Sequence, residues 1–553
     1  MRNILSLFFA LFSAILSAQV PQEGLKFFNR EELEQIIQTI GGPSFQGRGV
    51  GQPGYRMAAD YIAQNLREWG FQEMNPNPNT LVKEPGYFQM VPLWKESLKN
   101  ANIASSTKAV MFGENFVPYR TNGMTQLSVE NWVFLGYGIE DSKYTDFDVK
   151  TDIRGKGVII WDGEPQLKNG NFLVSGSKQS SKWGRLQTKI ENLSKKGASC
   201  ILVVTQNPST IQSQLNRWKE PRIQLDTTYL DVLKGPRFDV APDEKLMPVQ
   251  EMVVADAKEV VKPTTSAPSR PPVFYLMEKS AMEVFPTLPW KKMIKAKSSQ
   301  KSYPNEMLSM QVSLTVQKNM DKIEEPNVVG YIPGESGKTV VVSAHLDHLG
   351  MHEGKMYPGA DDDGSGSSAL LLMAKNIIEL KKSNFPFQHG ILFVWFTGEE
   401  SGLLGSEVFS NVPTVKRENI LCNLNVDMIG RNDQIHAGNT DYLYLIGSDR
   451  ISQRLHEISE QVNERCCQLK LDYTYNDEKD PNRYYYRSDH YNFAEKGIPV
   501  IFYFKGVHED YHKPTDTVEK IDLDSFLKAS RLVYETAYEL ISRPEDLPRK
   551  TKK

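Results

Sequence analysis

Hydrophobic positions in the second half of this chain change their spacing in a way that predicts alternating strands and helices. Thr339–Ser343 is a continuous, mainly β-branched run, which is typical of a strand buried on both faces of a sheet. Ser367–Leu380 follows it with apolar residues at helical spacing. Further strands are predicted at Ile391–Phe396, Leu421–Val426, Tyr442–Ile446 and Pro499–Phe504, and further helices at Ile451–Cys466 and Leu523–Ile541. The alternation predicts an α/β fold: an αβα sandwich around a mixed, mostly parallel sheet, with a binding site at the carboxyl ends of the strands.

The first half of the chain has a different texture. Asn29–Thr39 and Gly54–Trp69 have the spacing of amphipathic helices, and Gly70 ends the second one. From about residue 95 to 301, short β-rich runs are separated by turns and charged loops, and Lys262–Pro272 is rich in proline and predicts a loop. The short elements are the strands Trp132–Tyr137, Lys156–Trp161 and Cys200–Val204 and the helix Lys189–Lys196. The 553 residues exceed one ordinary core of about 250–300 residues, so we expect more than one domain.

Composition narrows the class of protein. Hydrophobic residues make up 40% and charged residues 24%, which is typical of a globular chain and excludes a fibrous or wholly disordered protein. The net charge of −3 offers no basic excess for a phosphate backbone, so nucleic acid is a poor candidate partner. Four cysteines cannot form a disulfide scaffold in a chain of this length, and we expect all four to behave as small hydrophobic residues.

The chain begins with the pattern of an export signal. Arg2 supplies a positive charge, Ile4–Leu16 is a short apolar run, and Ser17 and Ala18 offer a small-residue exit. The run is too short to span a bilayer, which takes about 20 apolar residues, and no later stretch is long and apolar enough to do so. We therefore predict a signal peptide over residues 1–18 and an exported protein, periplasmic or extracellular, without a membrane span. A buried N-terminal helix is the alternative.

Polar residues of one restricted kind follow the predicted strands. They are His345 and Asp347, the run Asp361–Asp363, the pair Glu399 and Glu400, Asp427, and His512. Because the carboxyl ends of parallel strands meet at one edge of a sheet, we expect these side chains to lie together. Imidazoles and carboxylates form a ligand set that suits Zn²⁺.

Two metal ions that share a carboxylate can hold a hydroxide between them and polarise a carbonyl group. Such a site needs one further carboxylate as a base. Glu399 and Glu400 can divide these tasks because adjacent residues after a strand can point in different directions. Asp347, two residues after His345, is placed to hydrogen-bond the ligating imidazole.

Five sequence blocks resemble those of the co-catalytic di-zinc exopeptidases, a family that includes bacterial secreted leucyl aminopeptidases, glutamate carboxypeptidase and the inactive transferrin receptor. The blocks are Ser343–Gly350, Gly359–Gly366, Thr397–Ser406, Asn425–Gly430 and Tyr511–Thr517, and they occur in the order of the family. The resemblance implies two Zn²⁺ per chain. It assigns His345 and Asp427 to one zinc, Glu400 and His512 to the other, Asp362 to the bridge and Glu399 to the general base. It also implies a tyrosine that binds the oxyanion. The spacing to the Ser-Asp-His motif favours Tyr485, although Tyr484 and Tyr486 are its neighbours.

The middle of the chain is similar to a protease-associated domain inserted into the peptidase domain, on the segments Leu135–Ile139, Lys189–Asn192 and Pro272–Phe274. This similarity implies peptidase parts at residues 25–94 and 310–548 and an insert at residues 95–309. The insert could cover the cleft, bind substrate or mediate a homodimer.

The resemblance implies a zinc exopeptidase that acts on peptides or oligopeptides, with an aminopeptidase favoured. A carboxypeptidase or dipeptidase is the alternative, and Arg431 and Arg487 are its candidate clamps for a substrate carboxylate. A glutaminyl cyclase or an inactive receptor-like binding protein fits less well, because every candidate ligand is present. Six other histidines match no ligand position, and we expect them on the surface or in loops: His348, His352, His389, His436, His456 and His508.

Overall fold

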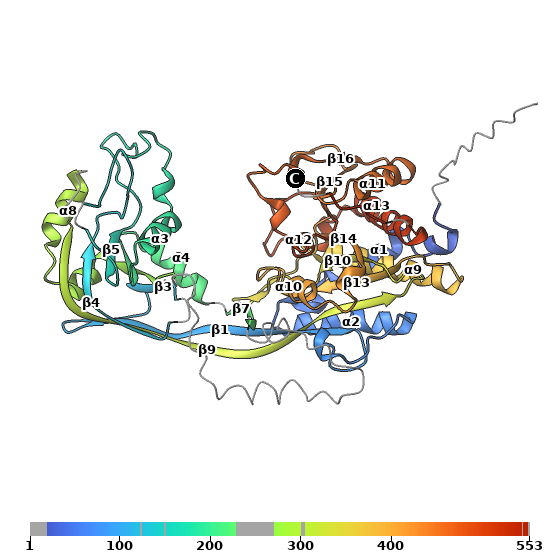
Figure 1. The fold of residues 1–553 in the computed structure, drawn as a ribbon, viewed down its shortest axis with the longest axis horizontal. Helices are drawn as coiled ribbons and strands as arrows, with labels where there is room; N and C mark the ends of the chain where they lie inside the picture. The colour runs from blue at the N-terminus through green and yellow to red at the C-terminus, as the bar shows by residue number, and fades with distance from the viewer. Residues whose placement is uncertain are drawn as a thin grey trace, which may run out of the picture. The chain divides into compact units, whose positions relative to one another are not determined.

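The structure is a computed structural model that describes residues 19–121, 124–148, 151–219, 221–227, 270–299, 305–544 and 546–550. The predicted signal peptide and most of the predicted proline-rich loop lie outside these residues. The described residues form two compact units. The first contains residues 19–94, 223–227 and 322–550, and the second contains residues 95–222 and 270–321, with the gaps just given. Two long strands, β1 (Phe88–Ser105) and β9 (Glu306–Ile332), carry the chain between the units (Figure 1).

The second unit begins at the residue where the sequence predicted the insert to begin, residue 95, and the predicted end at residue 309 falls inside β9. Its strands follow the order β9, β4, β5, β6, β8, β3. The four strands β4, β5, β6 and β8 run parallel to one another. Its elements are β2 (Ala109–Met111), β3 (Phe116–Arg120), β4 (Gln126–Phe134), β5 (Gly157–Trp161), α3 (Leu186–Lys195), β6 (Cys200–Thr205), α4 (Pro208–Lys219), β8 (Val273–Met277), α7 (Glu278–Val284) and α8 (Trp290–Ser299). The unit has hydrophobic clusters of its own, so it packs independently of the first unit's core.

The first unit contains a mixed, mostly parallel sheet, which confirms the predicted α/β fold. The strands lie in the order β16 (Lys470–Asp472), β15 (Tyr442–Ile446), β17 (Val500–Phe504), β14 (Ile420–Val426), β10 (Thr339–His345), β13 (Gly390–Phe396), β9. The central strand β10 is parallel to both of its neighbours, β13 and β14. Shorter strands are β7 (Arg222–Leu225), β11 (Gly350–His352) and β12 (Lys355–Tyr357).

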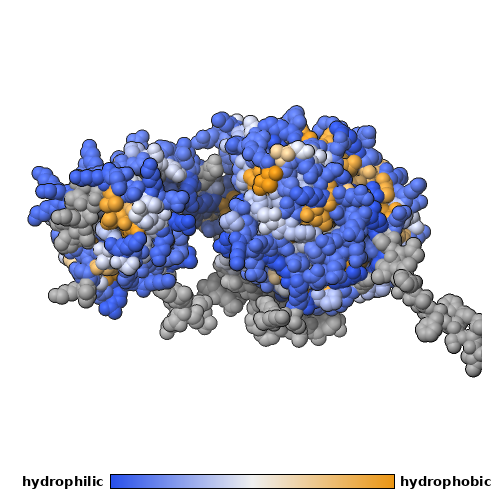
Figure 2. Space-filling model, turned by 90° about the horizontal axis from the view of Figure 1, so that it is seen from above, coloured by the Kyte–Doolittle hydropathy of each residue, from blue (hydrophilic) through white to orange (hydrophobic). Residues whose placement is uncertain are grey.

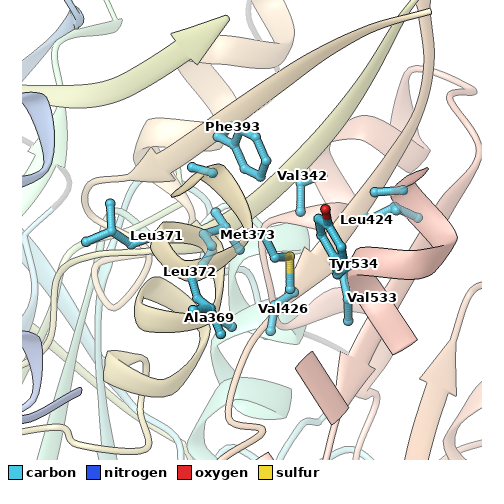
Figure 3. Close-up of a cluster of buried hydrophobic side chains, with 14 of the residues drawn as sticks. Val342, Ala369, Leu371, Leu372, Met373, Phe393, Leu424, Val426, Val533 and Tyr534 are labelled. Carbon is cyan, nitrogen blue, oxygen red and sulfur yellow. The ribbon is translucent and has the colours of Figure 1, made fainter. Parts of the chain in front are cut away.

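Helices cover both faces of this sheet. They are α1 (Arg30–Ile40), α2 (Pro53–Trp69), α9 (Gly364–Lys382), α10 (Leu404–Asn411), α11 (Gln453–Cys466), α12 (His490–Glu495) and α13 (Leu523–Ser542). Side chains of β10 and β13 alternate between the two faces, as the period of a strand requires. Val342 and Phe393 pack against α9 and α13 on one face, where Leu372, Met373 and Tyr534 also lie (Figure 3). Val341 and Val394 pack on the other face, in a cluster that includes residues of α10 and α12.

The first two helices begin and end at the residues that helix-capping rules predict. The side chain of Asn29 accepts a hydrogen bond from the backbone N–H of Glu32 at 2.9 Å and caps α1. Helix α2 begins at Pro53 and ends at Gly70, whose φ of 90° lies in the left-handed region. Among the described residues, no helix is both long and apolar enough to cross a membrane. The face shown in Figure 2 is mainly hydrophilic, with hydrophobic residues in small separate patches.

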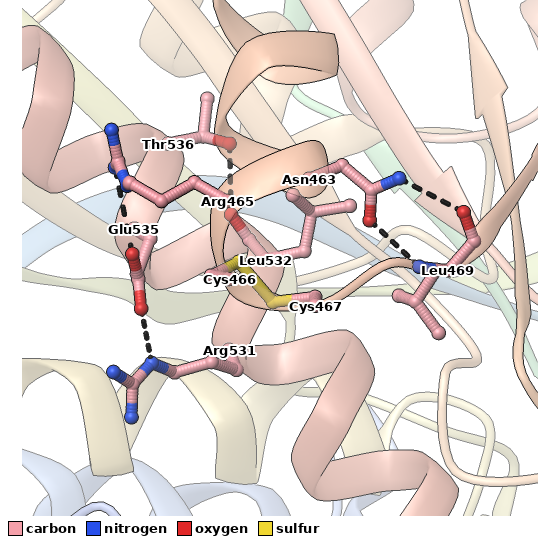
Figure 4. Close-up of a disulfide and its surroundings, with 9 residues drawn as sticks. All are labelled: Asn463, Arg465, Cys466, Cys467, Leu469, Arg531, Leu532, Glu535 and Thr536. Atoms are coloured by element: carbon pink, nitrogen blue, oxygen red, sulfur yellow. Dashed lines mark hydrogen bonds and ion pairs between the residues drawn. A yellow bond between two sulfur atoms is a disulfide. The ribbon is translucent and has the colours of Figure 1, made fainter. Parts of the chain in front are cut away.

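The expectation that all four cysteines stay free is wrong for two of them. Cys466 and Cys467 form a disulfide between adjacent residues at the end of α11 (Figure 4). The turn that follows is held by Asn463, whose side chain exchanges two hydrogen bonds with the backbone of Leu469. Cys200 and Cys422 are free and fully buried in strands, as expected.

Candidate metal centre

The candidate residues gather at the carboxyl ends of three adjacent parallel strands. His345 is the last residue of β10, Glu399 and Glu400 follow β13, and Asp427 follows β14. Two loops complete the cluster. Asp361–Asp363 lies just before α9, and His512 lies in the loop after β17. The structure therefore brings together the residues that the sequence analysis singled out, at the predicted edge of the sheet.

The imidazole of His345 is buried and held in one orientation. Its Nδ1 lies 2.9 Å from the backbone carbonyl oxygen of Asp347. Because a carbonyl oxygen only accepts hydrogen bonds, Nδ1 must carry the proton, which leaves the lone pair of Nε2 free to bind a cation. That Nε2 lies 3.4 Å from Oδ1 of Asp362 and 3.7 Å from Oδ1 of Asp427.

The three consecutive aspartates have different partners. Asp363 accepts hydrogen bonds from the N–H of Gly366 and of Met428, so it caps α9. Asp361 accepts a hydrogen bond from the N–H of Gly430 at 2.7 Å and lies 3.2 Å from Nε2 of His508. The side chain of Asp362 has no such backbone partner among the described residues. It lies between the imidazoles of His345 and His512.

The second half of the cluster surrounds Glu400. Its two carboxylate oxygens lie 2.8 Å from Nδ1 of His348 and 3.0 Å from Nε2 of His512. Oδ2 of Asp362 lies 3.2 Å from the same nitrogen of His512 and 3.7 Å from Nδ1 of His348. Asp362 thus contacts imidazoles of both halves, which is the position that a bridging carboxylate needs.

His348 lies in the loop after β10, as expected, but the sequence analysis matched it to no ligand position. It is 2% exposed and contacts two candidate ligands. The signal was its spacing of three residues from His345, which a tight turn after a strand can bring to the same site. His389, His436 and His508 lie in loops, as expected, and they are also buried. Of these, His508 touches the cluster, through Asp361.

Asp347 acts on this cluster differently from the expectation. Its carboxylate lies 4.0 Å from the imidazole of His345, so the hydrogen bond to the ring comes from its backbone carbonyl instead. The carboxylate oxygens accept hydrogen bonds from the N–H groups of Glu399 and Glu400, at 3.1 Å and 3.3 Å. Asp347 therefore orients the His345 ring with its backbone and holds the glutamate pair with its side chain.

A chain of buried hydrogen bonds orients Asp427. Ser488 donates from Oγ to Oδ2 of Asp427 at 2.7 Å and accepts from Nδ2 of Asn425 at 2.9 Å. Asn425 in turn accepts from Oγ of Ser343 at 2.7 Å, and Ser343 accepts from Nδ2 of Asn423 at 2.8 Å. The chain occupies one carboxylate oxygen of Asp427 and leaves Oδ1 facing His345.

The donor set fits divalent metal ions. Two groups of three residues bring ligand atoms within 4.8 Å of one another: His345, Asp363 and Asp427, and His348, Asp362 and Glu400. Several buried ligand atoms here make no hydrogen bond of good geometry among the described residues, even where an imidazole and a carboxylate lie close together: Oδ2 of Asp362, Oδ2 of Asp363, Oε1 of Glu400, both ring nitrogens of His348, and Nε2 of His512. Such atoms are costly to bury, and coordination to cations would satisfy them.

The pKa values in the cluster show how tightly these charges interact. Burial raises the pKa of Glu399 well above its usual range, and the carboxylates of Glu400 and Asp427 raise it further. Burial lowers the pKa of His512, but Asp362 and Glu400 outweigh this effect and raise it to about 10. Because metal ligands must be deprotonated, binding of metal ions here would release protons from these groups.

Tyr485 does not lie where the spacing placed it. The pocket beside the cluster is lined by His345, Asp362, Glu399 and Asp427 together with Tyr484, and Tyr485 is not among its lining residues. The ring of Tyr485 is 9% exposed and packs under the guanidinium of Arg450, 3.8 Å from its ring centroid. The three tyrosines form a short 3₁₀ turn, Tyr484–Tyr486, which turns successive side chains in different directions, and spacing alone could not choose among them.

Known proteins resemble the part of the chain that carries this site. Residues 327–537, the part of the chain that carries all of these residues, match the sequence profile of peptidase family M28. Over these residues the chain is similar to family M28. The M28 region is 31% identical over 226 residues to a probable leucine aminopeptidase of Arthroderma otae, a match that covers 40% of this chain and 58% of that protein. It is 28% identical over 233 residues to leucine aminopeptidase 1 of Ajellomyces dermatitidis, covering 40% of this chain and 58% of that protein.

The chain spans less than two thirds of the length of these M28 relatives. Among solved structures, the aminopeptidase from Aneurinibacillus sp. strain AM-1 aligns with 96% of this chain and 100% of its own, with a TM-score of 0.50 and 16% identity. That likeness extends the shared fold beyond the M28 region.

Proposed function

We propose that this protein is a zinc exopeptidase that removes residues from the amino terminus of peptides. The observation that carries the proposal is the cluster at the carboxyl edge of the first unit's sheet. There, several buried imidazole and carboxylate atoms make no hydrogen bond of good geometry, and they lie beside a pocket that Glu399 also lines, with its Oε2 4.0 Å from Nε2 of His345. The names of the M28 relatives, which are leucine aminopeptidases, support the same activity.

Two zinc ions fit the cluster best. His345 and Asp427 would hold one ion, Glu400 and His512 the other, and Asp362 would join them, because Asp362 contacts imidazoles of both halves. His348 is an additional candidate in the second half. When bound, zinc supplies a Lewis acid that polarises a carbonyl group and lowers the pKa of water.

The two glutamates after β13 take different tasks in this proposal. Glu400 touches His348 and His512 with its two oxygens, so it is engaged on the ligand side. Glu399 lines the pocket and has a raised pKa, so it is suited to accept a proton from the attacking water and pass it to the leaving amine. Tyr484, which lines the same pocket, replaces Tyr485 as the candidate oxyanion donor.

The preference for a free amine follows from charge. Asp362, Glu399 and Asp427 line the pocket, and a cluster of carboxylates favours the approach of a cationic peptide terminus. The test offers one peptide in three forms: free, N-acetylated and C-amidated. We expect acetylation to abolish cleavage by the zinc-loaded protein. Cleavage of the acetylated peptide, with loss of the amidated one, would indicate a carboxypeptidase.

Substitution of each glutamate separates their tasks. We expect Glu399→Gln to keep two zinc ions per chain and lose activity by about 10²–10⁴-fold, because an amide cannot accept the proton. Glu400→Gln is expected to lower zinc content, since it removes a charged ligand. Zinc content by elemental analysis and initial rates on a leucyl substrate measure both effects. If the two variants show the opposite phenotypes, the two assignments are reversed.

We also propose that the protein is exported, because its first 18 residues have the pattern of a signal peptide. The second unit is proposed to be a protease-associated domain. Its independent hydrophobic clusters support a separate domain. N-terminal sequencing of the protein from an exporting host would locate the cleavage site.

A further inference from the structure

The pocket beside the candidate metal centre combines an apolar wall with a single strong cation. Its wall contains Phe502, Phe504, Val507 and Tyr511. Among the described residues that line it, Arg487 is the only arginine or lysine. A guanidinium in a pocket of this kind does not help to bind a free amine, so the proposed aminopeptidase activity leaves it unexplained.

The guanidinium of Arg487 is held by rings and not by carboxylates. It lies over the ring of Tyr484, 5.0 Å from the centroid, and its Nη2 lies 3.5 Å from the hydroxyl oxygen of Tyr511. Within the part of the chain that the structure describes, no carboxylate comes within ion-pair distance of Arg487. An arginine has five donor hydrogens in a fixed fork, and the contact at 3.5 Å is at the limit for a hydrogen bond. Most of its donors are therefore free for a ligand.

Arg431, the other arginine that the sequence analysis named as a clamp, differs in this respect. It donates to Oδ2 of Asp510 at 2.7 Å and lies 3.2 Å from Oε1 of Glu509. Those carboxylates occupy its fork, so it stabilises the loop that leads to His512. This contrast leaves Arg487 as the candidate of the two that can bind a substrate group.

The surroundings of Arg487 favour a carboxylate as that group. A planar guanidinium binds a carboxylate through two parallel hydrogen bonds, and stacking on a ring fixes the plane of the fork in advance. Arg487 is exposed to solvent, and the neighbouring side chains of Phe502, Phe504 and Val507 offer no hydrogen-bonding group that would compete for the carboxylate.

We propose that Arg487 is a specificity-determining residue that binds a carboxylate of the peptide substrate. The inference rests on the proposed peptidase function and narrows its substrate class to short or acidic peptides. The carboxylate has two possible sources, the C-terminus of a dipeptide or an acidic side chain next to the cleaved bond. Both present the same chemistry to the guanidinium.

The experiment compares matched substrates that differ in one carboxylate. Leu-Gly and its amide test the C-terminal source, Leu-Asp-amide and Leu-Asn-amide test an acidic second residue, and Glu-Gly-amide and Gln-Gly-amide test an acidic first residue. In one of the pairs we expect the peptide with the carboxylate to have a kcat/KM about 10- to 100-fold higher than that of its neutral partner, mainly because its KM is lower. The free energy of a hydrogen bond to a charged group corresponds to a ratio of this size.

Three variants connect the discrimination to this side chain. Arg487→Met is expected to bring the ratio for that pair close to one, and Arg487→Lys to keep a smaller part of it, because an ammonium cannot form the bidentate pair. Arg483→Met is the matched control. Arg483 is an exposed arginine four residues earlier that lies over the ring of Tyr486, 4.8 Å from its centroid, and it does not line the pocket. It is expected to keep the wild-type ratio.

A binding measurement separates this inference from the proposed function. Calorimetric titration of the Glu399→Gln protein with the same pairs of peptides, with and without Arg487→Met, measures the affinity for each peptide in the absence of cleavage. A wild-type protein that cleaves none of the peptides would contradict the proposed function, and the titration would still decide the role of Arg487. Equal affinity for both members of every pair, or discrimination that persists in Arg487→Met, would overturn the inference.

Discussion

Arg48 offers the sharpest test of how the fold supports the candidate site. It is fully buried, and its guanidinium donates to four backbone carbonyl groups. Nε donates to Leu346 at 2.7 Å, Nη1 to Ile40 at 2.7 Å and to Pro358 at 2.9 Å, and Nη2 to Gly359 at 2.8 Å. Leu346 directly follows His345, and Gly359 lies two residues before Asp361, so Arg48 joins the two loops that carry candidate ligands.

The structure gives the expected size of the effect. Replacement of Arg48 by methionine leaves four buried carbonyl groups without a donor, at about 1–3 kcal/mol each. The sum, about 4–12 kcal/mol, is comparable with the whole stability of a typical domain, about 5–15 kcal/mol. We therefore expect Arg48→Met to fold poorly. Arg48→Lys keeps the charge but offers three donors on one nitrogen, which cannot reach carbonyls on three separate segments. It is expected to fold with reduced stability and weaker zinc binding.

Urea unfolding and zinc titration measure these effects. Arg67→Met on α2 is the matched control, because the side chain of Arg67 is 61% exposed and its charge partner, Glu73, is also on the surface. We expect the control to differ from the wild type by less than about 1 kcal/mol. Wild-type stability and wild-type zinc affinity in Arg48→Met would refute the argument that this arginine positions the two loops.

Two further predictions test other parts of the molecule. Ser488→Ala removes the O–H that orients Asp427, and we expect zinc affinity to fall about 10- to 100-fold in a competition titration, as is typical for partners of metal ligands; unchanged affinity would show that Asp427 needs no orienting partner. In the second unit, burial lowers the pKa of Lys189 from 10.5 to about 8, so the unfolded chain binds its proton more tightly and wild-type stability should rise relative to Lys189→Met between about pH 8 and 10.5. The rise should reach at most about 3.4 kcal/mol, at 1.36 kcal/mol per pH unit over the 2.5 units of the shift. A difference in urea midpoints that stays constant with pH would contradict it.

The elements that could be predicted from the sequence are those whose side chains are buried on a regular period. The predicted strand Tyr442–Ile446 coincides with β15. Five consecutive apolar residues between polar turns define where such a strand begins and ends. The long strand β9 was not predicted, because it begins after the region of short strands that was expected to end at about residue 301. It contains the alternation of a half-buried strand, with Val312, Leu314 and Val316 inward, but it then passes through a polar stretch, residues 317–324, in which Lys318 and Ile323 are half-buried and the other residues are exposed. Its 27 residues far exceed the usual length of a strand, about five to six residues.

The candidate site was predictable in its residue types and its location, and not in its orientations. The order of strands and the restriction to histidine, aspartate and glutamate place the cluster at one edge of the sheet, because parallel neighbours end together. The position of His348 at the cluster and the choice among Tyr484, Tyr485 and Tyr486 could not be predicted, for a common reason. Each of these residues lies in a turn of irregular backbone, and neither the period of a helix nor that of a strand says which way such a side chain points.

Adjacent acidic residues in this site differ in the hydrogen bonds that their carboxylates accept from backbone N–H groups. Asp361 and Asp363 are each engaged by N–H groups of the loop after β14, so part of each carboxylate is committed to holding that loop. Asp362, between them, has no such partner among the described residues and is the carboxylate that faces both halves of the cluster. For the same reason Asp347 cannot serve as a ligand: its two carboxylate oxygens already accept hydrogen bonds from the N–H groups of Glu399 and Glu400. Since these donors lie far away in the sequence, the division of tasks among neighbouring carboxylates is a property of the folded chain. A substitution such as Asp363→Asn, which keeps an acceptor for both N–H groups, should therefore be tolerated better than Asp363→Ala, which leaves them unpaired.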